Sequence, residues 1–286
     1  MLLKRILLYL LVAGCTIWLV LISTWINISS KALTPWISTQ LNDYLPKRYQ
    51  AEIEVAETHF LGLTTGQIQI DDLATQMPVL TIQSIEISIN YFSLIVFQEI
   101  DYKVRLYQGK IEGKMDLFPR RLTRFSLSEI QINRNAAIRK TNLLLSNPVI
   151  KGKGTFLIET TPEGKLDLAI QQVLLSGDPS HTDIPFELPD TQLSMIEGEF
   201  IFKGTDTTVR LLTKGDLSMN ISGTVNIDQS SPVKSQLDLA INGTISPDYE
   251  TKLGVFKSLL VNYKNQNGDI SVNISGNPRR PRIKKI

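Results

Sequence analysis

The sequence predicts a mainly β protein. We expect one N-terminal transmembrane helix, followed by an elongated antiparallel β-sheet or sandwich, or a curled β-groove, with one or two short amphipathic helices. Three observations predict this fold class: residues 6–30 contain no charge, apolar and polar residues alternate with period two over most of the later chain, and helical periodicity is confined to two short stretches.

These patterns divide the chain into five segments. We expect a cytoplasmic end at residues 1–5, a membrane anchor at 6–28, a membrane-proximal amphipathic helix at 31–46, a β-rich domain at 50–278 and a basic tail at 279–286. A subdivision of the β-rich domain is expected near residues 119–150, where basic residues gather. The later segments are long enough to bury a sizeable core as one or two domains.

The anchor is predicted because about twenty apolar residues suffice to span a bilayer as a helix. The residues expected to form this anchor include Ile6, Leu10, Cys15, Trp18, Leu21 and Trp25. Residues 12–15, Val-Ala-Gly-Cys, also have the form of a lipoprotein cleavage site, after which Cys15 would become a lipidated N-terminus. The apolar run continues beyond Cys15, whereas a signal peptide gives way to a polar chain, so the uncleaved helix is preferred and lipoprotein processing stays the alternative.

The charges that flank the anchor predict its orientation. Lys4 and Arg5 precede the apolar run, and the first charge after it is Lys31. Because positive charge stays on the cytoplasmic side, the rest of the chain is expected outside, which in a bacterium is the periplasm.

The first helical stretch follows the anchor. Thr34 and Pro35 resemble an N-cap followed by proline at the first helical position, and Pro46 ends the periodic pattern. One face of this helix would carry Trp36, Ile37, Gln40, Leu41, Tyr44 and Leu45. The second helical stretch covers residues 249–263.

Strand periodicity is clearest late in the chain, where one apolar face is predicted. Its members are Leu217, Met219, Ile221, Val225, Ile270, Val272 and Ile274. The nine residues from Gly215 to Gly223 return at Gly268 to Gly276 with seven identities, which suggests strands stacked in an elongated architecture. A sheet with one apolar face must hide it, either in a sandwich or in a trough that receives lipid or a partner segment, and both remain open.

Charge and chemistry exclude several functions. The net charge of +2 does not argue for nucleic acid as a partner. The basic residues Arg120, Arg121, Arg124, Arg279, Arg280 and Arg282 are candidate contacts for anionic lipid head groups, with a solvated strand face and a frayed tail as the alternative. Neither His59 nor His181 has metal-ligand spacing, and no nucleophile elbow, phosphate loop or dinucleotide fingerprint occurs. We therefore expect no catalytic site, no cofactor and no metal.

In the second half, strand segments separated by glycine include Gly215-Asp216-Leu217, residues 221–225 and 235–239, and Gly268-Asp269 with Ile274-Ser275-Gly276. Through these residues the second half resembles the type II secretion system protein N family (general secretion pathway protein N). The first half resembles the wider AsmA-like and TamB-like group through residues 63–73 and 108–113.

This resemblance implies a non-catalytic subunit of a secretion machine in a Gram-negative bacterium. The subunit would be anchored in the bacterial inner membrane by a single pass, with its N-terminus cytoplasmic and its bulk periplasmic, and its partners would be other secretion-system subunits. The AsmA-like similarity implies an alternative, a periplasmic β-groove that binds or transfers phospholipid.

Overall fold

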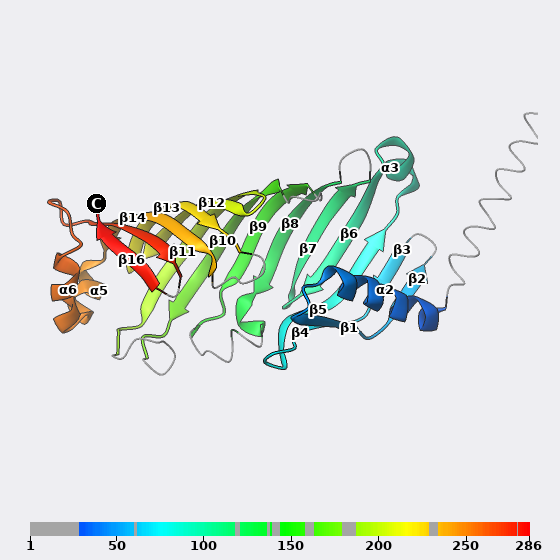
Figure 1. Ribbon diagram of the computed structural model, residues 1–286, viewed down its shortest axis with the longest axis horizontal. Helices are drawn as coiled ribbons and strands as arrows, with labels where there is room; N and C mark the ends of the chain where they lie inside the picture. The colour runs from blue at the N-terminus through cyan, green and yellow to red at the C-terminus, as the bar shows by residue number, and fades with distance from the viewer. Residues whose placement is uncertain are drawn as a thin grey trace, which may run out of the picture.

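The structure is a computed structural model that describes residues 29–59, 62–117, 121–135, 138, 144–157, 163–178, 187–228, 234–278 and 280–286. Within these residues, sixteen strands form one continuous antiparallel sheet, and consecutive strands are neighbours from β4 to β16. Figure 1 shows that the strands lie obliquely across the long axis of the molecule, so that the sheet grows along that axis as the chain proceeds.

The strands are mostly eight to thirteen residues long. In the first half they are β1 (Tyr49–Ile53), β2 (Ala56–His59), β3 (Gly62–Thr65), β4 (Ile68–Asp72), β5 (Met77–Ser88), β6 (Glu99–Leu106), β7 (Gly109–Asp116) and β8 (Leu122–Gln131). In the second half they are β9 (Val149–Leu157), β10 (Glu163–Leu175), β11 (Thr191–Lys203), β12 (Asp206–Gly215), β13 (Leu217–Asn226), β14 (Gln236–Ile245), β15 (Ile270–Asn277) and β16 (Arg280–Lys285).

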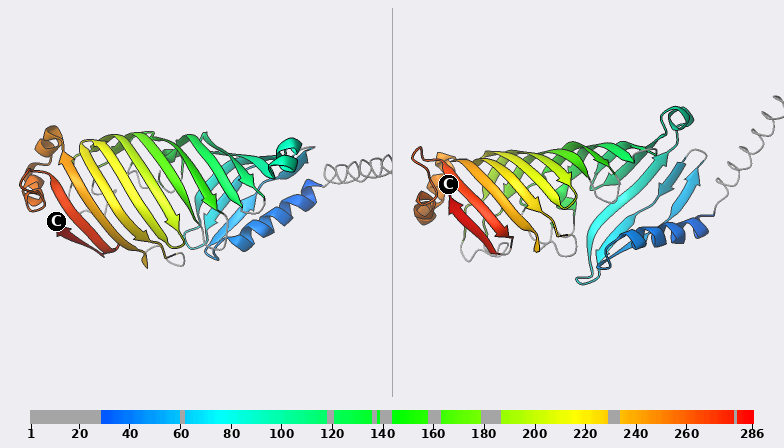
Figure 2. Two further views of the ribbon diagram at one scale, coloured as in Figure 1. Left: turned by 90° about the horizontal axis from the view of Figure 1, so that it is seen from above. Right: turned by 45° about the horizontal axis from the view of Figure 1, so that its top comes forward.

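The helices that the structure describes lie at the margins of the sheet. They are α2 (Ser30–Tyr44), α3 (Tyr91–Val96), α5 (Pro247–Lys252) and α6 (Lys257–Val261), with the short 3₁₀ helices η1 (Ile132–Arg134) and η4 (Gly254–Phe256). Figure 2 shows α2 beside the N-terminal strands and α5 with α6 at the opposite end of the sheet. The protrusion α3 between β5 and β6 was not expected from the sequence.

The predicted fold class needs correction at the N-terminus. Among the helices that the structure describes, none is long and apolar enough to cross a membrane, and α2, the longest, has 15 residues where about twenty apolar residues are needed. The predicted N-terminal transmembrane helix is therefore unsupported. Its residues 6–28, including all six named anchor positions, lie outside the described part of the chain.

Further expectations about the fold differ from the structure. The sandwich is wrong, because the described strands form one sheet and no second sheet lies over its apolar face. Thr34 is not an N-cap: α2 begins one turn earlier, and Ser29 caps it by accepting a hydrogen bond from the Lys31 N–H at 3.2 Å. The sheet also runs without interruption from β8 to β9, across the expected subdivision near residues 119–150.

Helix α2 protects the N-terminal edge of the sheet. The Asn42 side chain both accepts from the backbone N–H of Ala51 at 2.7 Å and donates to the Ala51 carbonyl at 2.9 Å. The Thr34 hydroxyl accepts from the Ala56 N–H at 2.8 Å. An edge strand otherwise presents unpaired backbone groups to other chains, and these side chains satisfy such groups at one position of β1 and one of β2.

The salt bridge between Arg48 and Asp72 ties the turn after α2 to the end of β4. The Arg48 Nη2 lies 2.6 Å from the Asp72 Oδ2, and the Asp72 carboxylate also accepts from the Ala74 N–H. The hydrogen bond from Arg48 lowers the pKa of Asp72. The two carboxylates Asp71 and Asp72 therefore mark the end of a strand, where Asp72 has a structural role.

We predict that Asn42→Ala destabilises the protein by about 1–3 kcal/mol, because the N–H of Ala51, a residue only 1% exposed, loses its partner. Thermal unfolding followed by circular dichroism measures the change. The control is Gln40→Ala on the exposed side of the same helix, which should leave the melting temperature almost unchanged. Equal melting temperatures for the two variants would contradict the edge-capping role of α2.

Candidate functional site: an apolar concave face

The strand register aligns apolar residues in continuous rows along the sheet. Directly opposed residues on neighbouring strands point to the same face, so the register connects positions far apart in sequence. The central row consists, in sheet order, of Thr58, Leu63, Ile87, Tyr102, Gly113, Phe125, Gly154, Leu166, Phe200, Val209, Gly223, Leu239, Ile274 and Ile283.

Two parallel rows flank the central one. The first contains Ile85, Val104, Ile111, Leu127, Gly152, Leu168, Gly198, Leu211, Ile221, Ile241, Val272 and Lys285. The second contains Ile100, Met115, Thr123, Phe156, Gly164, Phe202, Thr207, Val225, Leu237, Gly276 and Pro281. We call these three sets the concave rows.

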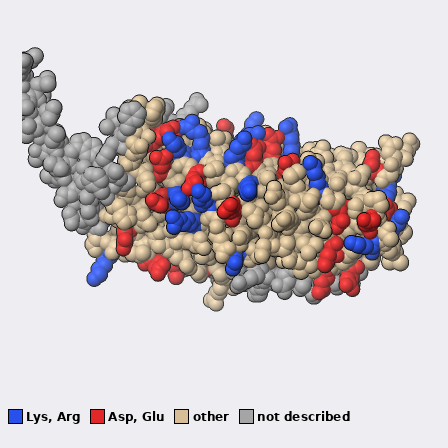
Figure 3. Space-filling view, turned by 180° about the vertical axis from the view of Figure 1, so that it is seen from behind, with Lys and Arg blue, Asp and Glu red and all other residues tan. Residues whose placement is uncertain are grey.

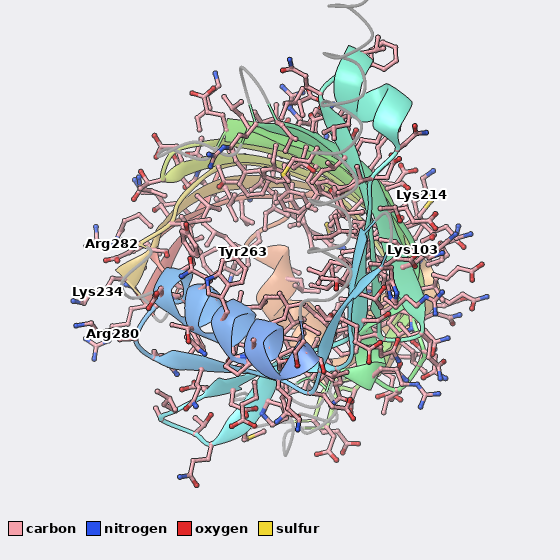
Figure 4. All side chains as sticks on the ribbon, turned by 90° about the vertical axis from the view of Figure 1, so that its right-hand side faces the viewer. Lys103, Lys214, Lys234, Tyr263, Arg280 and Arg282 are labelled. Atoms are coloured by element: carbon pink, nitrogen blue, oxygen red, sulfur yellow. The ribbon has the colours of Figure 1, made fainter. Side chains whose placement is uncertain are left out.

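The sheet curves so that the concave rows face inwards. Figure 4 looks along the long axis and shows the ribbon bent around a central space, with mainly carbon side chains pointing into it. The labelled Lys103 and Lys214, which belong to the opposite face, point outwards. The structure is therefore a trough with an apolar lining, and the lining runs along the length of the molecule.

The lining is incompletely buried. Leu166, Phe200, Leu239 and Ile274 in the central row are only half-buried, although each would be a core residue in a two-layer sandwich. Each strand contacts mainly its neighbours in the sheet, so the described residues supply no second layer over these side chains. An apolar surface of this kind normally marks an interaction site.

Glycines and aromatic rings alternate in the middle of the trough. A Cβ atom added to Gly154 would lie 2.5 Å from the ring of Phe125, and one added to Gly164 would lie 2.5 Å from the ring of Phe156. The rings of Phe125 and Phe156 stack with centroids 5.8 Å apart, and the ring of Phe202 lies 5.1 Å from that of Phe156. The glycines thus leave room for large side chains on the inner side of a curved sheet.

The C-terminal end of the trough is closed by the segment between β14 and β15. Leu260 and Tyr263 pack against a buried cluster of Met219, Ile270 and Val272. Tyr249 is buried, and its hydroxyl bonds the Thr191 hydroxyl at 2.6 Å and the Pro189 carbonyl at 3.2 Å. Figure 4 shows Tyr263 towards the inner side of the sheet. We call residues 246–263 the end cap.

An ion pair joins Glu250 of the end cap to Lys264, which directly follows the cap and forms an isolated backbone bridge with Ile270 at the start of β15. The Lys264 ammonium lies 2.7 Å from the Glu250 carboxylate, and Lys257 lies 3.5 Å from the same oxygen. The hydrogen bond from Lys264 is the main cause that lowers the pKa of Glu250. Both Glu250 and Lys264 are only about one-fifth exposed, at 18% and 22%.

The convex face is polar and carries both signs of charge. One outward row contains Glu86, Lys103, Glu112, Ser126, Lys153, Asp167, Glu199, Arg210, Ser222, Ala240, Asn273 and Lys284. Figure 3 shows Lys and Arg intermixed with Asp and Glu on this side. Opposite charges on neighbouring strands of this face form ion pairs. The Lys165 ammonium lies 2.6 Å from the Glu199 carboxylate, and the hydrogen bond between them raises the pKa of Lys165 and lowers that of Glu199. This face is suited to water.

The structure places the seven predicted apolar-face residues on the concave side, but in two environments. Met219, Ile270 and Val272 are buried under the end cap, and Leu217 and Ile221 pack against them. Val225 and Ile274 are half-buried in the lining. The candidate face left out Tyr102 and Phe125, although period two marks Ile85, Ile87 and Val104 in the same rows as half-buried strand positions. The two aromatic residues lie opposite Gly113 and Gly154 on neighbouring strands, and this cross-strand placement appears only in the register.

The predicted head-group contacts do not form one cluster. Arg120 and Arg279 lie outside the described residues. The Arg124 guanidinium forms salt bridges with the carboxylates of Glu99, at 2.7 Å, and Asp116, at 2.8 Å. Arg121 precedes β8, whereas Arg280 and Arg282 lie on β16, and strands β9 to β15 separate the two groups.

The described residues contain no group of three or more His, Cys, Asp or Glu side chains that could hold a metal ion. His59 is exposed on β2, and His181 lies outside the described residues. Comparison with protein-family models, with curated proteins and with solved structures finds no match to this chain. The resemblance to the secretion protein N family and to the AsmA-like group therefore stays a prediction.

We predict that the ion pair of Glu250 makes the stability of the end cap depend on pH. Because folding lowers the pKa of Glu250, the pair stabilises the folded state above the ordinary carboxyl pKa of 4.5, and this stabilisation is lost as the pH falls through the lowered value. At neutral pH Glu250→Gln should melt below the wild type, and the difference should vanish in acid.

Lys264→Met is the matched control, because it removes the same pair from the other side. The double variant should melt close to either single variant, since the two changes break one interaction. A melting difference between wild type and Glu250→Gln that does not change with pH would contradict this role.

Proposed function

We propose that the concave rows bind the acyl chains of a lipid. The single observation that carries the proposal is the half-buried state of Leu166, Phe200, Leu239 and Ile274 in the central row, over which the described residues place no second layer. Acyl chains are flexible, long and apolar, so they match a lining that is continuous in one direction. Transfer of apolar surface from water to the lining stabilises the complex by about 25 cal/mol per Å².

Several features favour a lipid over a compact apolar ligand. The lining extends along the sheet from β2 to β16. Its polar positions are mainly hydroxyls, such as those of Thr123 and Thr207, and its one charged position, Lys285, lies on the last strand. A compact ligand would instead be expected in a bounded cleft with convergent polar groups. The end cap closes one end of the trough, which leaves the N-terminal end as the entrance.

The role as a structural subunit of a secretion machine rests on the residues that carry the resemblance, and it stays a prediction. The periplasmic location of the β-rich domain also stays a prediction. The lipid proposal does not depend on either, because it follows from the lining of the trough.

The test compares photo-crosslinking from adjacent residues on opposite faces. A photoreactive phenylalanine derivative is placed at Leu239 or Phe200 on the concave side, and at the neighbouring Ala240 or Glu199 on the convex side. The full chain is illuminated in cells grown with radioactive phosphate, and labelled lipid that migrates with the protein is measured.

We expect labelling from Leu239 and Phe200 and little from Ala240 and Glu199. The neighbouring positions lie one residue apart on opposite faces, so they control for expression and for membrane proximity. Equal labelling from both faces, or no labelling from the concave positions, would contradict lipid binding in the trough.

A further inference from the structure

The two edges of the sheet differ in protection. At the N-terminal edge, Asn42 and Thr34 of α2 bind the backbone groups of Ala51 and Ala56. At the C-terminal edge, all six residues of β16 are exposed, and no described element covers the strand. Figure 1 shows β16 as the last strand at its end of the sheet.

The register shows which backbone groups of β16 are available. The Ile286 N–H donates to the Ser271 carbonyl at 3.1 Å, so the pair of Ser271 and Ile286 is a hydrogen-bonded one. Hydrogen-bonded and non-hydrogen-bonded pairs alternate along an antiparallel ladder. Pro281, Ile283 and Lys285 therefore direct their backbone groups to the free edge, and Arg280, Arg282 and Lys284 bond β15.

Pro281 fits this assignment. Proline has no N–H, and it is tolerated on an edge strand where that group would face solvent. The free edge therefore offers two N–H donors, those of Ile283 and Lys285, and three carbonyl acceptors. This is enough to pair with an extended segment of about five residues.

The side chains of β16 define the chemistry of that segment. Arg280, Arg282 and Lys284 point to the convex face, opposite Asn277, Ser275 and Asn273 of β15. No ion pair to these three cations occurs among the described residues. Pro281 and Ile283 continue the concave rows, and Ile283 is 50% exposed.

We propose that the free edge of β16 binds an extended acidic segment of a partner protein by strand addition. The partner would alternate acidic residues, placed beside Arg280, Arg282 and Lys284, with apolar residues placed beside Pro281 and Ile283. Opposite charges on adjacent strands are favourable, and like charges are unfavourable. The added strand would extend the concave rows by one further strand beyond β16.

The same charges select against a second copy of this chain. Two β16 strands side by side would oppose basic residues to basic residues. At the other edge, β1 and β2 carry acidic Glu52 and Glu57, but α2 already holds the backbone there. The inference concerns the edge and not the lining, so it holds whether or not lipid fills the trough.

The test uses the full chain and fluorescent peptides. The acidic probe alternates Glu and Val over seven residues, the basic probe carries Lys in place of Glu, and a third probe has the composition of the first with its acids grouped together. Binding is followed by fluorescence anisotropy at low salt and again at raised salt. We expect the acidic alternating probe to bind about tenfold more tightly than the other two, and salt to weaken it.

Variants of β16 test the site itself. Ile283→Pro removes a donor at the free edge without touching the bonds to β15, and Arg282→Glu reverses one charge. Each should weaken the acidic probe about tenfold, whereas Lys214→Glu, an exposed reversal on β12, should not. Circular dichroism confirms that each variant is folded. Absent binding of the acidic probe, equal binding of the basic probe, or binding unchanged by both β16 variants would overturn the proposal.

Discussion

One constraint governs this molecule: a long sheet has one apolar face, and the described residues place no second layer over it. Strands that alternate apolar and polar residues require that one face be withdrawn from water. In this protein the sheet is curved, so that the concave rows face one another across a central space (Figure 4). The end cap covers part of the remainder by packing Leu260 and Tyr263 on the cluster around Met219. What stays half-buried is the surface available to a ligand.

The strand alternation could be predicted from the sequence because it depends on neighbouring residues alone. The repeated nine-residue motif corresponds to β13 and β15, which flank β14, so each copy presents its aliphatic residues to the same side. Helical spacing at residues 249–263 likewise indicated the region of the end cap. These features are local, and period two or 3.6 is sufficient to reveal them.

The shape of the sheet could not be predicted in the same way, because curvature is the sum of small twists over many strands. The alternation of apolar and polar residues along a strand is the same in a sandwich and in a trough. The concave rows could therefore be identified only from the pairing register of the strands. The residues of β16 looked like a basic tail because a single aliphatic residue, Ile283, stands among its charges. The edge-capping role of Asn42 had no sequence signal, since it joins a helix to a strand through one amide.

The central claim, an open apolar lining, is tested most directly by the reactivity of cysteines placed in the trough. In a Cys15→Ala background, Leu166→Cys on the concave face and Lys165→Cys on the convex face are treated with a small, charged thiol reagent. An open trough predicts that the two sites react at rates within about tenfold of each other in lipid-free protein, because reagent reaches both without unfolding. Reaction of Leu166→Cys slower by several orders of magnitude, at the rate set by global unfolding, would show a closed core and contradict the account.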